Sequence, residues 1–222
     1  PDRIVIGGND SLKLQKLKDL YSNFEAEIIT TDPISSQLIK YLANTYLPLR
    51  LSFVNEAARL VNSSGGNLDD VLKGVGMDSR IGQHYFRPSP AWGGSCFPKD
   101  VVEVNNFYDS DEVNLPLIAN IIESNKIQTQ WTANMLKSIH NEKKLNGIIL
   151  VGAAFKEDTD DLRNSPTIDI YNELKAENMN TMIYDDLIKS EDYLSIEDFE
   201  NLAEPHLIAL MYPVKEDLMS KI

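Results

Sequence analysis

The first part of the chain alternates short apolar runs with helical patterns. The run IVI, followed by two glycines, predicts a strand over residues 3–7. Apolar residues recur at helical spacing over residues 11–24, and the segment AEIITTD at residues 26–32 predicts a second short strand. The expected order is therefore strand, helix, strand.

A long helical pattern follows, from about Ile34 to Asn62. Asp32 and Pro33 suit its start, because aspartate caps free N–H groups and proline fits the first helical position. Pro48 is expected to kink this helix, since proline removes one backbone hydrogen bond and clashes with the preceding turn. A helix of this length usually packs along much of its surface, so we expect a helix-rich dimer core.

The middle of the chain places polar and glycine-rich segments between helices. Asn67 suits the N-cap of a short helix that ends at glycines. Residues 79–97 are rich in Gly, Pro, Ser and aromatic side chains, and we expect them to form an ordered loop. A helix is expected to begin near Pro98, and another long helix to cover about residues 116–140.

The last third of the chain has the pattern of a parallel sheet. The fully apolar run at residues 148–155 predicts a buried strand, and two further strands are predicted at residues 180–186 and 206–211. Helical patterns lie between them, at residues 165–179 and 195–205. Alternating strands and helices predict a doubly wound α/β domain after the central helices.

The composition narrows the classes of protein. An apolar content of 42% and a charged content of 25% are ordinary for a globular protein. The net charge of −13 argues against nucleic acid and an anionic membrane as partners. We expect a cytoplasmic location, because no signal peptide opens the chain and one cysteine cannot form an internal disulfide. The chain enters a strand at once without a Met, so we expect it to be part of a longer protein.

The segment WGGSCFPKD at residues 92–100 surrounds the single cysteine, Cys96. Free cysteines are often buried as small apolar residues, and that interpretation stays open. The local sequence favours a nucleophile instead. Gly93 and Gly94 let a backbone approach a ligand closely. A helix start near Pro98 and the charge of Lys99 would both favour the reactive thiolate.

A nucleophilic cysteine needs helper groups. None of the three histidines lies in an obvious catalytic motif. Lys40 and Asn44 are four residues apart on the long helix, so they share a face and could donate hydrogen bonds to an oxyanion. Asp100 follows the thiol by four residues. From the residues alone, however, a solvated lysine and an incidental asparagine are the favoured interpretation.

Four segments resemble the UDP-glucose/GDP-mannose dehydrogenase family in the same order along the chain: KYLANTYLPLRLSFVNEAARL, DSRIGQHYFRPS, GGSCFPKD and GAAFKEDTDDLRNSP. Members of this family have an NAD-binding Rossmann domain, a central helical dimerisation domain and a Rossmann-like UDP-binding domain. The resemblance implies that residues 1–31 are a remnant of the first domain. Residues 32–142 would form the central domain with the catalytic cysteine, and residues 143–222 a truncated third domain. The G-x-G-x-x-G dinucleotide fingerprint does not occur in the chain.

The resemblance also implies a chemistry, the NAD-dependent oxidation of UDP-glucose to UDP-glucuronate, a precursor of polysaccharides. Cys96 matches the nucleophile, which forms a thiohemiacetal and then a thioester. Lys40 and Asn44 match the pair that holds the oxyanion and a water, which reverses the interpretation from the residues alone. Asp100 matches an aspartate that orients this water. The implied protein is a homodimer through the long central helix and needs no metal.

Further binding residues follow from the same resemblance. Arg80 matches an arginine that reaches the substrate across the dimer interface. The residues matching the loop that grips the UDP-sugar are Tyr85, Arg87, Ser89 and Gly93. The residues matching substrate contacts on the C-terminal domain are Phe155 and Lys156. NAD phosphates are expected to touch Lys99 and Arg163. Core packing of the aromatic residues and solvation of the charged ones are the alternatives.

The loop departs from the family pattern at Ala91, where the family has Gly, and Pro90 is also unusual. A Cβ atom limits backbone freedom, so the substrate stays open. UDP-glucose is favoured, with UDP-N-acetylhexosamine or GDP-mannose as alternatives. A non-catalytic dimerisation and nucleotide-sugar-binding module is the alternative of another class. The chain alone is not expected to turn over, because the family's upstream catalytic glutamate and threonine would lie outside it.

Overall fold

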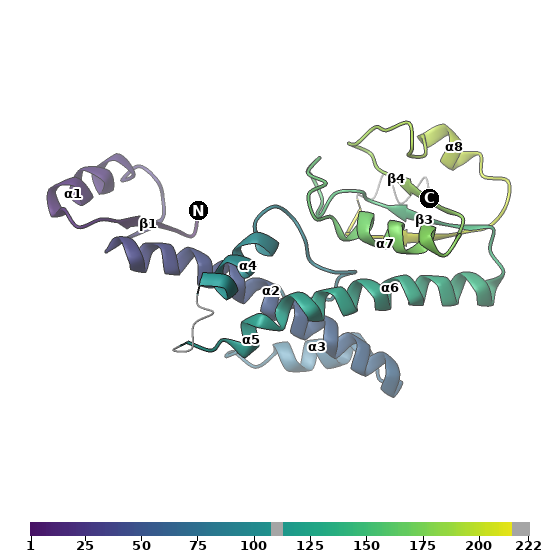
Figure 1. Ribbon diagram of the computed structural model, residues 1–222, viewed down its shortest axis with the longest axis horizontal. Coiled ribbons are helices and arrows are strands. Elements are labelled where there is room, and N and C mark those ends of the chain that lie inside the picture. The colour runs from purple at the N-terminus through teal and green to yellow at the C-terminus, as the bar shows by residue number, and fades with distance from the viewer. Residues whose placement is uncertain (108–112, 215–222) are drawn as a thin grey trace. The chain divides into compact units, whose positions relative to one another are not determined.

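Packing divides the computed structural model into two compact units, residues 1–46 and 47–222, and each is described by itself. The structure describes residues 1–107 and 113–214 (Figure 1). The expected α/β class with parallel sheets is confirmed.

The first unit is a strand–helix–strand arrangement followed by the start of a long helix. Strand β1 (Arg3–Gly7) pairs in parallel with β2 (Glu27–Thr31), and helix α1 (Ser11–Leu20) connects them. Helix α1 ends four residues earlier than predicted. The backbone N–H groups of Tyr21 and Phe24 close successive turns there, so the chain leaves the helix before reaching β2.

Helix α2 (Pro33–Ser64) begins in the first unit and continues into the second. The Asp32 carboxylate accepts a hydrogen bond of 2.9 Å from the Ser35 backbone N–H, as expected for the residue before a helix. The helical assignment continues without interruption through Pro48.

The central part of the second unit is helical. Its elements are α3 (Leu68–Gly76), α4 (Phe97–Phe107), α5 (Pro116–Ala119) and α6 (Ile121–Lys143). The Asn67 side chain caps α3 as predicted, accepting from the Asp70 N–H. The single long helix predicted over residues 116–140 is wrong, because it is two helices that meet at Asn120. The Asn120 backbone has ψ −6°, and its side-chain amide donates to the Pro116 carbonyl, in competition with the helical hydrogen bonds.

A three-stranded parallel sheet forms the C-terminal part. Its strands are β3 (Gly147–Val151), β4 (Thr181–Tyr184) and β5 (His206–Leu210), in the order β4-β3-β5. Helices α7 (Pro166–Ala176) and α8 (Ile196–Glu200) follow β3 and β4. Strand β3 is shorter than predicted. The chain turns at Gly152, which has φ +102°, and a Cβ there would lie 2.5 Å from the Tyr212 ring.

The core of this part lies on both faces of β3, whose five residues are all buried. Ile148 and Leu150 pack with apolar residues of α6 and α7. Ile149 and Val151 face the other way and pack with Phe199 of α8. The sheet thus has helices on both faces (Figure 1), as the doubly wound pattern predicts.

Candidate active site

The thiol of Cys96 is exposed and lies directly before helix α4. The Cys96 carbonyl accepts a hydrogen bond of 3.0 Å from the Asp100 N–H, which makes Cys96 the residue that opens the helix. The positive end of a helix dipole therefore lies beside the sulfur, as the sequence predicts. The alternative of a buried, apolar cysteine is wrong, because the side chain is exposed.

Lys99 and Asp100 form an ion pair in the first turn of this helix. The Lys99 Nζ lies 2.5 Å from Asp100 Oδ1, and the lysine side chain is 60% exposed while the aspartate side chain is 2% exposed. A buried carboxylate is stable only with such partners. Asp100 is therefore held firmly one helical turn from the thiol, while the ammonium group reaches solvent.

Two glycines bring the loop before Cys96 against the segment that follows β3. A Cβ on Gly93 would lie 1.9 Å from the Asn164 carbonyl oxygen. Gly94 has φ +92°, and a Cβ there would lie 2.8 Å from the Phe155 ring. The Asn164 side chain also donates to the Gly94 carbonyl at 3.1 Å. These glycines permit a close approach of two parts of the chain, in addition to any approach of a ligand.

Arg163 lies near Cys96 and is paired with Asp161. Its guanidinium donates to both Asp161 carboxylate oxygens at 2.8 Å and lowers the pKa of Asp161 to about 2. The pKa of Arg163 is raised by Asp161 above all, and also by the negative charge that Cys96 can carry. The arginine side chain is 71% exposed, so a cation accessible to solvent lies close to the thiol.

The loop from Pro88 to Trp92 has no regular secondary structure, and side chains from two helices hold it. Asn125 of α6 accepts from the Trp92 N–H at 2.9 Å and donates to the Trp92 carbonyl at 2.8 Å. The Trp92 indole N–H donates to the Ser52 hydroxyl of α2 at 2.9 Å. Trp92 is buried, so these bonds satisfy its backbone and its ring together.

The preceding residues of the loop are fixed in the same way. The Ser89 N–H donates to Asn55 of α2 at 2.8 Å, and Gln128 of α6 donates to the Ser89 carbonyl at 2.9 Å. The Thr132 hydroxyl donates to the Pro90 carbonyl at 2.9 Å. Ala91 is not among the residues with positive φ, so its Cβ is accommodated without backbone strain.

A pocket of about 390 Å³ lies between this loop and the carboxyl ends of the strands. The loop contributes Ser89, Pro90 and Ala91 to its lining, and the segment after β3 contributes Phe155 and Lys156. The sequence-predicted residues Ser89, Phe155 and Lys156 are thus brought together. Ligands of open parallel sheets bind at this edge, outside the carboxyl ends of the strands.

Asp185 ties these strand ends together from a buried position. One carboxylate oxygen accepts from the Ala153 N–H at 2.7 Å and from the Tyr212 hydroxyl at 3.1 Å. The other accepts from the N–H groups of Leu187 and Ile188 at 2.8 and 2.9 Å. Since Tyr212 lines the pocket, Asp185 orients one of its walls.

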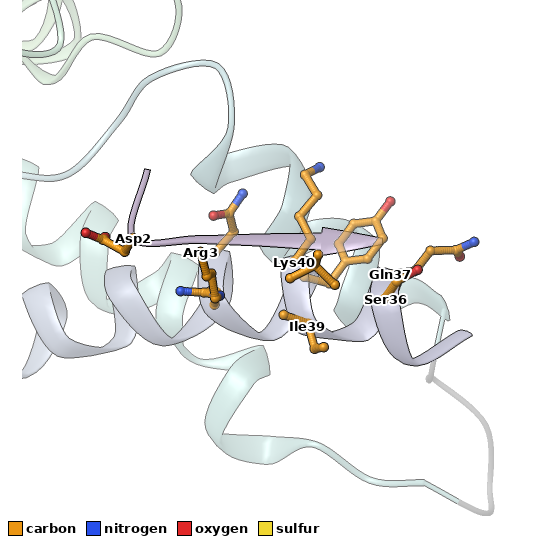
Figure 2. Close-up of a pocket in the computed structure, with 10 residues that line it drawn as sticks. Asp2, Arg3, Ser36, Gln37, Ile39 and Lys40 are labelled. Carbon is orange, nitrogen blue, oxygen red and sulfur yellow. The ribbon is translucent and has the colours of Figure 1, made fainter. Parts of the chain in front are cut away.

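Lys40 and Asn44 line a separate open pocket of about 630 Å³ within residues 1–46. Figure 2 shows Asp2, which directly precedes β1, and Arg3, its first residue, along the part of α2 that carries Lys40. The structure thus brings the predicted lysine–asparagine pair to one cavity, with the arginine as a second cation.

The remaining predicted residues lie at the surface. The Arg80 guanidinium pairs with Asp78 at 2.7 Å, and the arginine side chain is 88% exposed. The Asp78 side chain raises the pKa of Arg80. Tyr85, in a left-handed conformation with φ +55°, and Arg87 are both exposed and line a shallow pocket of about 380 Å³. The pocket with Ser89 does not include Tyr85 or Arg87 in its lining.

Sequence reasoning missed several residues that hold the site, namely Asn125, Gln128, Asp185 and Tyr212. One signal was present. Asn125, Gln128 and Thr132 recur at spacings of three and four on one face of a helix, and the last two are buried. Polar side chains in a buried stripe point to specific hydrogen-bonding partners.

Comparison with known proteins agrees with this fold. The central domain of the UDP-glucose/GDP-mannose dehydrogenase family matches residues 34–127, and the UDP binding domain of the same family matches residues 149–212. The α/β chain, with a thiol at a helix start and a pocket at the carboxyl edge of a parallel sheet, therefore matches two domains of one dehydrogenase family. The chain belongs to the UDP-glucose/GDP-mannose dehydrogenase family.

Individual relatives give the extent of the match. UDP-glucose 6-dehydrogenase of Rickettsia felis is 36% identical over 95% of this chain, and that of Gallus gallus is 32% identical over 98%. The solved UDP-glucose dehydrogenase of Pyrobaculum islandicum is 29% identical over 96% of this chain, with a TM-score of 0.81. The chain covers 46% of the Rickettsia protein and 52% of the Pyrobaculum chain, so it spans about half the length of these relatives. Among the described residues, no helix has the length and apolar character needed to cross a membrane.

Proposed function

We propose that this chain is part of an NAD-dependent enzyme that oxidises UDP-glucose to UDP-glucuronate, a precursor of polysaccharides. The observation that carries the proposal is the exposed thiol of Cys96 at the start of α4, on the loop that also lines the 390 Å³ pocket. The relatives named UDP-glucose 6-dehydrogenase support the substrate.

The thiolate of Cys96 attacks the aldehyde carbon formed in the first oxidation and gives a thiohemiacetal. Loss of a second hydride converts this adduct to a thioester. Water then adds to the thioester carbon, the carbon–sulfur bond breaks, and the products are the carboxylate and the free thiol. The positive end of the helix dipole and the guanidinium of Arg163 both lie near the sulfur that makes this attack.

Lys40 and Asn44 are proposed to donate hydrogen bonds to the substrate oxygen as negative charge develops on it. Their common pocket within residues 1–46 supports a joint role. Asp100 is proposed to orient the attacking water, and its ion pair with Lys99 fixes the position of its carboxylate. Arg80 is proposed to reach the substrate of a partner subunit, in a homodimer formed through the long helix α2.

The pocket between the loop and the C-terminal sheet is proposed to hold the UDP-sugar, with Ser89, Gly93, Phe155 and Lys156 as contacts. Tyr85 and Arg87, which line the shallower pocket nearby, are proposed to extend this grip. Lys156 is exposed beside the pocket and supplies the positive charge that a diphosphate needs on a chain of net charge −13.

NAD supplies the hydride acceptor for both oxidations. Lys99 and Arg163 fit phosphate contacts, because both have exposed cationic ends near Cys96. A reduced thiol fits the proposed cytoplasmic location.

Titration calorimetry of the chain with UDP and GDP tests the binding site. We expect UDP to bind and GDP to bind at least tenfold more weakly, roughly 1.4 kcal/mol. Absence of uridine-nucleotide binding to the folded chain would contradict the proposal. Stronger binding of GDP would favour a GDP-mannose enzyme. A UDP-N-acetylhexosamine that binds more tightly than UDP-glucose would shift the substrate to that branch.

The thiol separates an enzyme from a non-catalytic nucleotide-sugar-binding module. We expect iodoacetamide to alkylate Cys96 faster than free cysteine at pH 7. In the complete enzyme, Cys96→Ser should stop the second oxidation, whereas Glu103→Gln, at an exposed position of α4, serves as the control. Normal turnover in Cys96→Ala would exclude the covalent mechanism.

A further inference from the structure

The backbone of Trp92 lies in a loop, and among the described residues no strand pairs with it. Its N–H and C=O are in a buried loop and both need partners. Asn125 supplies both with one side chain, accepting at 2.9 Å and donating at 2.8 Å. The planar side-chain amide supplies one donor and one acceptor side by side, which is the arrangement that the Trp92 backbone needs.

The same face of α6 continues the contact along the loop. Gln128 donates to the Ser89 carbonyl and Thr132 to the Pro90 carbonyl, both at 2.9 Å. The pocket-lining residues from Ser89 to Ala91 therefore lie between fixed points, and Cys96 follows Trp92 by four residues.

We propose that Asn125 is a positioning residue for the candidate active site. It clamps the Trp92 backbone, and through this residue it sets the pocket wall formed by residues 89–91 and the path of the chain to Cys96. This inference rests on the proposed function. Nothing in the clamp requires Asn125 to touch the ligand, since Asn125 is not among the residues that line the pocket.

Asn125→Asp gives a reversible test. A carboxylate keeps the acceptor for the Trp92 N–H but loses the donor and places negative charge against the Trp92 carbonyl. A protonated carboxyl group restores both hydrogen bonds, because it again has one donor and one acceptor. The ordinary pKa of an aspartate is about 3.9, so UDP affinity should fall by about tenfold at pH 8 and recover to within about threefold of wild type at about pH 4.

The control is Asn134→Asp, which adds the same charge at an exposed position of α6. It should stay within about twofold of wild type at both pH values. The contacts around position 125 include Glu56, which accepts from Ser124, and Arg59, which donates to Gln128. Both remain in every variant, and wild type is measured at each pH, so effects of pH that arise away from position 125 cancel in the comparison.

A second readout needs no ligand. In a Trp131→Phe background, Trp92 is the only tryptophan. Its emission in Asn125→Asp should shift to the red at pH 8 and return towards the wild-type position at about pH 4, while the control stays constant. If Asn125→Asp does not fold at pH 8, Thr132→Val, which removes one hydroxyl from the same face, should weaken UDP binding by about threefold.

The outcomes separate the two proposals. Failure of wild type to bind UDP overturns the proposed function, and the Trp92 emission then decides the positioning role. UDP affinity in Asn125→Asp equal to that of the control at pH 8, a loss that acid does not reverse, or emission that does not follow pH would each overturn the role of Asn125. If Thr132→Val is used instead, a UDP affinity equal to that of wild type would also overturn this role.

Discussion

The two parallel sheets of this chain differ in how their apolar residues are covered. All five residues of β3 are buried, whereas Ile6 is the one buried residue of β1. Strand β3 has a hydrogen-bonded strand on each side and helices on both faces. Within the part of the chain that the structure describes, β1 pairs with β2 alone, and α1 beside it buries none of its residues.

This difference shows that an apolar pattern in the sequence does not by itself bury the side chains that form it. Leu12 and Leu20 occur at helical spacing and predict α1 correctly, but they are 75% and 68% exposed. Ile148 and Leu150 come from an equally apolar run and are fully buried. The pattern indicates which face of an element is apolar. What covers that face depends on the other elements, and burial rather than pattern determines the stabilisation.

The largest expected effect is on the free energy of unfolding, and it is tested with one leucine-to-alanine substitution in each region. Leu150→Ala should lower the free energy of unfolding by about 2–5 kcal/mol, because it leaves a cavity in a closed core. Leu12→Ala removes the same atoms from an exposed position and should change it by less than about 0.5 kcal/mol. Urea unfolding followed by circular dichroism measures both. Equal losses would mean that Leu12 is covered in solution.

A smaller effect is expected at the carboxyl edge of the C-terminal sheet. Asp185→Asn should lower the free energy of unfolding by about 1–3 kcal/mol and weaken UDP binding, because an amide cannot accept all four hydrogen bonds. The matched control is Asp186→Asn, whose exposed carboxylate accepts from the Tyr184 hydroxyl.

The control should lose about 1 kcal/mol or less. Tyr212→Phe keeps the ring against Gly152 and removes one hydrogen bond to Asp185, so its loss should fall between the two. Equal stability of Asp185→Asn and wild type would show that the carboxylate does not hold the strand ends together.

Most elements could be predicted from the sequence, and their ends could not. Helical periodicity identified α2, and apolar runs identified β1 and β3, because several neighbouring residues carry each of these signals. The errors occur at single residues. Gly152 ends β3 beneath the Tyr212 ring, and Asn120 separates two helices by bonding to its own preceding turn. Such events depend on one backbone angle or one contact.

In the candidate site too, local features could be predicted from the sequence, and contacts between distant residues could not. A helix start beside Cys96 is a local feature, and the motif around the thiol predicted it. The Asn125 clamp on Trp92 joins residues 33 positions apart, and Asp185 bonds to Ala153 from 32 positions away. Sequence spacing carries no information about such pairs until the fold is known. The roles of the predicted catalytic and binding residues stay predictions.

The smallest effect compares one carboxylate from each region, Asp161 and Asp32. Arg163 lowers the pKa of Asp161 from 3.8 to about 2, and hydrogen bonds from Ser35 lower the pKa of Asp32. A carboxylate with a lowered pKa in the folded state contributes stability above pH 3.8, and this contribution is lost as the pH falls through the folded pKa. Asp161→Asn and Asp32→Asn should therefore each flatten the acid side of the stability curve, for Asp161 in the range from about pH 4 to 2.

Salt distinguishes the two causes. The Asp161–Arg163 pair is a charge–charge contact at the surface, so about 1 M salt, with a Debye length of about 3 Å, should shrink the difference between Asp161→Asn and wild type. The Asp32 carboxylate accepts from the neutral Ser35 backbone, so the effect of Asp32→Asn should persist. Thermal unfolding between about pH 2 and 5, a range that includes the ordinary carboxyl pKa values, measures the effects of both substitutions at low and at high salt. If salt removed both differences equally, the helix cap of α2 would be acting through its charge and not through its hydrogen bonds.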